Sequence, residues 1–108
     1  KKGRKEQLKM RNEIEMLAKE ELMTANKKFP LFHSSPEGFA VILEEVEELS
    51  EEAAEMGKTI NSWWLYIRRN EDINVQKKRV DRIREHAINA AMEAIQVIAM
   101  CDKFKMSL

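Results

Sequence analysis

The sequence predicts an all-α fold, with three helices in a single domain that spans residues 1–108. Only three glycines and two prolines interrupt the chain, and no alternation of apolar and polar residues indicates a strand. In two long stretches the apolar residues instead recur every three or four positions, which is the heptad spacing of helices that pack along a seam. With 44% hydrophobic and 35% charged residues, the composition is that of a globular domain and not of a disordered chain.

A first amphipathic helix is expected from Lys5 to about Lys28, because apolar residues follow one face and charged residues the other. Pro30 disfavours helical backbone at Phe29, so the helix should end there. The apolar face carries Met10, Ile14, Leu17, Ala18, Leu22 and Ala25.

The second helix is expected from Pro36 to about Arg69, with a bend permitted at Gly57. Ser35 is the preferred N-cap, and Ser34 with Glu37 forms an alternative capping box. The predicted seam of this helix consists of Ile42, Val46, Leu49, Ala53, Met56, Ile60, Trp63 and Ile67.

The third helix should span residues 75–104, after a turn at residues 70–74 whose two asparagines disfavour helix. Its seam carries Val80, Ile83, Ala87, Ala90, Ala94, Val97, Cys101 and Phe104. Because the turn is short, the second and third helices should form an antiparallel hairpin. The expected register places Glu48 at the level of Gln96 and Glu52 at that of Glu93.

One hairpin and one shorter helix cannot cover two such seams. Pairing two hairpins completes a four-helix bundle and buries them, so we expect a homodimer or a dimer of dimers. The residues around Val46, Leu49, Ala90 and Ala94 should lie in this interface.

Charge is unevenly distributed, although the formal net charge is zero. Residues 37–57 hold eight glutamates and no lysine or arginine, whereas residues 58–84 hold eight basic and three acidic residues. Glu45, Glu48, Glu52 and Glu55 fall on one flank of the second helix, where they either face solvent or hold a cation. The overall balance argues against nucleic-acid binding as the main function.

Nothing in the sequence predicts a membrane segment, because no apolar run approaches the roughly 20 residues that a spanning helix needs. The basic start KKGRK is not followed by the apolar segment of a signal peptide. A single cysteine, Cys101, forms no disulfide framework, so a soluble protein in the reducing cytoplasm is expected.

Three short segments carry a further signal, namely FHSSPEG at residues 32–38, AVILEEVEEL at residues 40–49 and EAIQVIAM at residues 93–100. Together they resemble the MazG-like all-α nucleoside triphosphate pyrophosphohydrolases, and in particular their small phage-type branch. The superfamily carries EExxE on one helix and ExxD on the next. Glu44, Glu45 and Glu48 match the first motif, while the second is matched by Glu93 with Gln96 in place of the aspartate.

The resemblance implies a site for Mg²⁺, or alternatively Mn²⁺, held by Glu45, Glu48, Glu93 and Gln96. It also implies a reaction in which water attacks the α-phosphorus of a nucleoside triphosphate and releases a nucleoside monophosphate and pyrophosphate. Glu44 and Glu45 are then the candidate catalytic residues, Glu44 in an outer-shell or base role. Trp64 is a candidate for stacking on the base and Lys58 for contacting phosphate.

A second hypothesis keeps the same fold without catalysis. The replacement of the expected aspartate by Gln96 would then mark a vestigial acidic site. In that case the chain is a helical module for oligomerisation or for binding another protein, and its glutamates form a solvated face.

Overall fold

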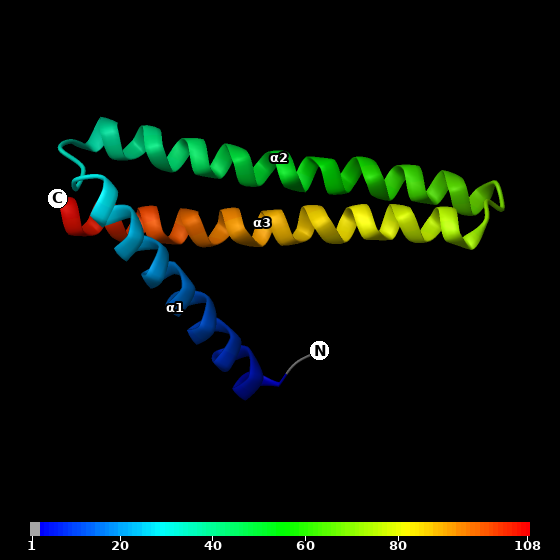
Figure 1. Ribbon diagram of the computed structural model, residues 1–108, viewed down its shortest axis with the longest axis horizontal. Coiled ribbons are helices and arrows are strands. Elements are labelled where there is room, and N and C mark those ends of the chain that lie inside the picture. The colour runs from blue at the N-terminus through cyan, green and yellow to red at the C-terminus, as the bar shows by residue number, and fades with distance from the viewer. Residues whose placement is uncertain (1–2) are drawn as a thin grey trace. The chain divides into compact units, whose positions relative to one another are not determined.

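The computed structural model describes residues 3–108, and within this range the chain contains three α-helices and no strand. Helix α1 spans Arg4–Lys28, α2 spans Ser35–Arg68 and α3 spans Ile73–Ser107 (Figure 1). The predicted all-α class with three helices is therefore confirmed. Helix α2 continues through Gly57 without interruption.

The chain divides into two compact units that share the two long helices. The first unit consists of the chain up to Val46 together with Ala94–Leu108, and the second consists of Glu47–Glu93. Residues 1 and 2 of the predicted domain lie outside the described residues.

The second unit is a helical hairpin, and backbone hydrogen bonds end α2 at its turn. Asn70 has a left-handed conformation with φ of 55°, and its N–H donates to the Ile67 carbonyl at 3.1 Å. The N–H of Glu71 donates to the Tyr66 carbonyl at 3.0 Å. This pair of bonds is a Schellman motif, in which asparagine is the most tolerated residue after glycine.

Asp72 is the N-cap of α3, which begins at Ile73. Its side-chain Oδ2 accepts a hydrogen bond from the N–H of Asn74 at 2.9 Å, as an N-cap does. Because the C-cap of α2 and the N-cap of α3 are almost adjacent, the turn is shorter than the one predicted at residues 70–74. The third helix consequently starts two residues earlier than predicted.

Polar side chains of α2 face α3 in this hairpin, beside Trp63 of the apolar seam. Thr59 is 3% exposed, Glu52 Oε2 lies 2.6 Å from His86 Nδ1, and Trp63 Nε1 donates to Gln76 Oε1 at 3.2 Å. The prediction that Glu52 lies opposite Glu93 is wrong. Glu52 contacts His86, which precedes Glu93 by about two helical turns along α3. Several seam residues are exposed instead, namely Ile60, Ile67 and Val80.

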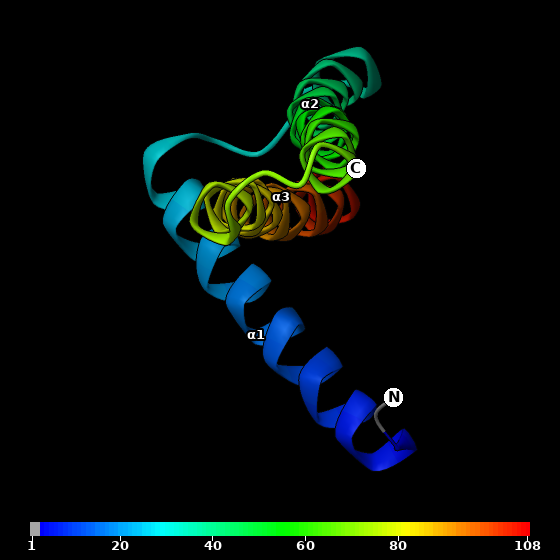
Figure 2. The same cartoon turned by 90° about the vertical axis from the view of Figure 1, so that its right-hand side faces the viewer.

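The first unit has a small apolar core where the end of α1 meets the start of α2 and the end of α3. Its buried apolar side chains are Ala18, Leu22, Phe32 and Ala99. The segment between α1 and α2, cyan in Figure 2, is attached to α3 by the Phe32 N–H, which donates to Ser107 Oγ at 2.9 Å. Phe29 is extended, as the following proline predicted.

Gly38 permits close packing at the start of α2. A Cβ atom at this position would lie 2.5 Å from Cδ2 of Phe104 and 3.1 Å from Cδ2 of Phe32. Only glycine allows both rings to approach the helix so closely.

Ser34, and not Ser35, is the N-cap of α2. Its Oγ accepts a hydrogen bond from the Glu37 N–H at 3.3 Å, and Ser35 is already the first helical residue. The preferred cap was therefore wrong, and the Ser34 half of the alternative capping box is confirmed. Either serine can supply the oxygen, so sequence alone does not choose between them.

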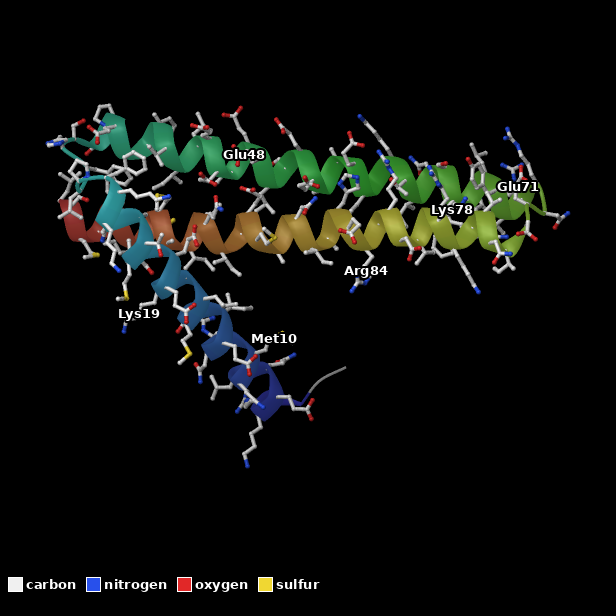
Figure 3. The ribbon with its side chains drawn as sticks, in the orientation of Figure 1. Met10, Lys19, Glu48, Glu71, Lys78 and Arg84 are labelled. Carbon is white, nitrogen blue, oxygen red and sulfur yellow. The ribbon has the colours of Figure 1, made fainter. Side chains whose placement is uncertain are left out.

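The first half of α1 leaves much of its apolar face open. Met10, Ile14 and Leu17 of this face are exposed, as are Leu8 and Met16 elsewhere on the helix. Figure 3 labels Met10 on this part of the helix. Among residues 3–108, no helix has the length and hydropathy required to cross a membrane.

Candidate functional site

Two carboxylates face each other across the helical hairpin of the second unit. Glu48 belongs to α2, where Figure 3 labels it, and Glu93 belongs to α3. Each offers a carboxylate oxygen within 4.8 Å of the other, and both side chains are half-buried. Antiparallel pairing of the helices thus brings together two residues that are distant in sequence.

Glu45 adds a third carboxylate from the preceding turn of α2. Because α2 is unbroken from Ser35 to Arg68, the three-residue spacing places Glu45 and Glu48 on the same face of the helix. One oxygen of Glu45 lies within the same 4.8 Å limit, and this side chain is also half-buried. We call Glu45, Glu48 and Glu93 the acidic cluster.

The chemistry of the acidic cluster suits a hard divalent cation. Carboxylate oxygens are the ligands that Mg²⁺ prefers, and it is commonly held by one or two of them together with water. Glu93 Oε2 is buried, and no hydrogen-bond partner for this atom is found in the described part of the chain. A buried carboxylate oxygen without a donor is costly, so a cation there would be stabilising.

Glu52 and Glu55, which follow Glu48 on the same flank of α2, have basic partners. Glu52 contacts His86, and Glu55 lies 3.9 Å from Arg82 and 3.4 Å from Lys58. These glutamates therefore have protein partners that link α2 to α3 or stabilise α2 itself. The contact of Glu52 with His86 was not predicted, because the expected register placed a different residue opposite Glu52.

The first unit contains a cavity of about 470 Å³. Its wall is mainly apolar, with polar groups from all three helices. The lining residues are Glu21, Ala25, Phe29, Pro30, Phe32, Glu37, Val41, Glu45, Gln96, Met100 and Lys103. Glu45 and Gln96, two of the candidate metal ligands, thus line one cavity.

Lys103 was missed by the sequence reasoning, although it is only 3% exposed. Its Nζ lies 5.0 Å from the centre of the Phe32 ring. The available signal was its position two helical turns after Gln96, on the same face of α3. Its neighbours Asp102 and Lys105 are also charged, so the local pattern did not indicate that Lys103 lies on the inner face.

The other predicted site residues lie apart from the acidic cluster. Glu44 is exposed on α2. Lys58 is paired with Glu55 and its side chain is 75% exposed, and Trp64 is 58% exposed. Along α2, Lys58 and Trp64 follow Glu48 by about 15 and 24 Å. The substrate contacts assigned to them stay predictions.

Comparison of the chain with protein-family models, with curated proteins and with solved structures found no match. The MazG-like resemblance therefore rests on the three short segments alone and stays a prediction.

Proposed function

We propose that the chain is a divalent-cation-dependent nucleoside triphosphate pyrophosphohydrolase that acts as a homodimer or a dimer of dimers. The observation that carries the proposal is the approach of Glu45, Glu48 and Glu93 within 4.8 Å. The EExxE motif and the partial ExxD motif supply the reaction class, which three glutamates alone would not specify.

In this proposal Glu45, Glu48 and Glu93 hold Mg²⁺, with the Gln96 side-chain oxygen as a further candidate ligand. The bound cation would neutralise charge on the triphosphate. In this proposal Glu45, which also lines the cavity, would orient a water molecule toward the α-phosphorus and accept its proton. Cleavage between the α- and β-phosphates yields a nucleoside monophosphate and pyrophosphate.

The decisive experiment measures pyrophosphate release from the four ribonucleoside and four deoxyribonucleoside triphosphates, with Mg²⁺ or Mn²⁺. Glu48→Gln and Glu93→Gln should each lower the rate at least about tenfold, because a lost ligand weakens the metal and the charge that it supplies. Glu47→Gln is the matched control, since Glu47 is exposed on the same helix. Absence of pyrophosphate release with either metal would reject the proposal.

The exposed apolar face of α1 favours a second candidate function, a non-catalytic module for oligomerisation or protein binding. Met10 is 43% exposed and Leu17 49% exposed on this face, and exposed apolar surface of this kind commonly marks an interaction site. This candidate predicts no metal-dependent hydrolysis, and it predicts that Glu48→Gln leaves assembly and partner binding unchanged.

A further inference from the structure

A cationic side chain, Lys103, lines the cavity of the first unit. Lys103 is 3% exposed, and its Nζ lies over the Phe32 ring at 5.0 Å from the centroid. None of the ion pairs within residues 3–108 includes Lys103. An ammonium group has three donors and the ring face satisfies at most part of this capacity, so an acceptor inside the cavity would be stabilised.

The walls of the cavity favour a flat, weakly polar ligand. Phe29, Phe32, Pro30, Val41 and Met100 contribute apolar surface. Aromatic rings and methionine pack well against a planar heterocycle. A volume of about 470 Å³ falls within the range of small-molecule sites.

The polar groups of the cavity wall argue against a small inorganic anion as the ligand. Glu21, Glu37 and Glu45 all line the cavity beside Lys103, so carboxylates outnumber the single cation. They would repel free phosphate, yet they can accept hydrogen bonds from N–H donors of a neutral ligand. The ligand should therefore present an acceptor to Lys103 and a donor to a carboxylate.

We propose that this cavity binds a heterocyclic base that carries both a ring carbonyl and an exocyclic amino group, as cytosine and guanine do. Lys103 donates a hydrogen bond to the carbonyl oxygen, and a carboxylate of the wall accepts one from the amino group. Identifying the heterocycle as the base of a nucleotide rests on the proposed function. Lys103 is then the residue that determines base specificity, and Phe32 is the aromatic surface beside the base.

The test uses nucleosides without phosphate or metal, so that the acidic cluster does not contribute to binding. The full chain, labelled with ¹⁵N, is titrated with cytidine, uridine and adenosine and followed by NMR. Cytidine should bind at least about tenfold more tightly than uridine, which lacks the amino group, and than adenosine, which lacks the carbonyl. The largest shifts should occur at the Phe32 amide and the Gln96 side chain, because both residues line the cavity.

Lys103→Met keeps most of the apolar stem and removes the donor, so it should abolish the preference for cytidine over adenosine. Lys105→Met, on the exposed surface of the same helix, is the matched control and should retain it. Circular dichroism verifies folding. If Lys103→Met does not fold, Lys103→Arg, which keeps a cationic donor, should preserve the preference. Its loss in a folded Lys103→Arg protein would contradict the proposal.

Equal binding of the nucleosides, tighter binding of inorganic phosphate than of cytidine, or an unchanged preference in folded Lys103→Met would each overturn the inference. Pyrophosphate release with no base preference would overturn it and leave the proposed hydrolase function standing. Selective cytidine binding without hydrolysis of any triphosphate would support the cavity assignment and reject the hydrolase function.

Discussion

At the residue scale, Glu93 is the most informative member of the acidic cluster. Its Oε2 is buried without a hydrogen-bond partner among residues 3–108, and its carboxylate approaches those of Glu45 and Glu48. Two like charges about 5 Å apart repel by roughly 1 to 3 kcal/mol, depending on the effective dielectric constant. The metal-free protein therefore carries a local destabilisation that a cation can remove.

Glu93→Gln should accordingly raise the free energy of unfolding of the metal-free protein by about 1 kcal/mol, because it removes one charge from the cluster. It should also abolish the increase in melting temperature that Mg²⁺ gives the unmodified protein. Thermal denaturation with and without Mg²⁺ measures both effects. Glu51→Gln, at an exposed position of α2, serves as control. An identical response to Mg²⁺ in both variants would mean that the cluster holds no cation.

Gln96→Asp tests the partial second motif. It adds a carboxylate to the cavity wall beside Glu45, so the affinity for Mg²⁺ should rise by about tenfold while the metal-free protein becomes less stable. Isothermal titration calorimetry gives the affinity. Unchanged Mg²⁺ affinity would remove Gln96 from the set of candidate ligands.

At the element scale, the turn between α2 and α3 depends on the left-handed conformation of Asn70. Asn70→Ala should destabilise the protein by about 1 kcal/mol, because a Cβ without a compensating polar group is disfavoured in this conformation. Asn70→Gly should cost nothing or stabilise slightly. Urea denaturation of both variants distinguishes this conformational effect from the loss of the asparagine side chain, which would affect them equally.

Gly38→Ala should destabilise the packing of α2 against Phe104. The added Cβ would meet the Phe104 ring at 2.5 Å, and such overpacking typically costs about 1 to 3 kcal/mol. The better helix propensity of alanine offsets up to about 1 kcal/mol of this cost. Gly57→Ala is the matched control, since no atom lies within 4 Å of its added Cβ, and it should be stabilising in the same denaturation experiment.

The helices themselves could be predicted because their evidence is local. Heptad spacing and the effect of Pro30 on Phe29 place the elements within three residues of their observed ends. The choice between Ser34 and Ser35 as the cap, and the exact closure of the turn by Asn70, depend on backbone geometry that a pattern does not encode.

The candidate site could be predicted only in part, because a sequence pattern does not encode how the helices pack. Periodicity shows that Glu45 and Glu48 share a face of α2, and the resemblance linked them to Glu93. Periodicity does not fix the register between two antiparallel helices, so the contact of Glu52 with His86 was missed. Lys103 was missed because a buried lysine contradicts the ordinary distribution of charged residues.

At the scale of the whole molecule, the proposed assembly explains why many large apolar side chains are exposed. Val46 is 39% exposed, so Val46→Glu should leave the individual helices intact while placing a charge in the expected interface. Light scattering should show a dimer or tetramer for the unmodified protein and a smaller species for the variant. Glu47→Gln, at the neighbouring exposed position, should not change the mass. A monomeric unmodified protein at micromolar concentration would contradict the assembly.

The small core of the first unit has a thermodynamic consequence. With buried apolar side chains limited, among residues 3–108, to Ala18, Leu22, Phe32 and Ala99, little hydrophobic free energy holds one copy folded in isolation. If a second copy supplies the missing burial, folding and association form a single equilibrium. Mass action then makes the melting temperature rise with protein concentration, so dilution alone would unfold the chain at constant temperature and solvent composition.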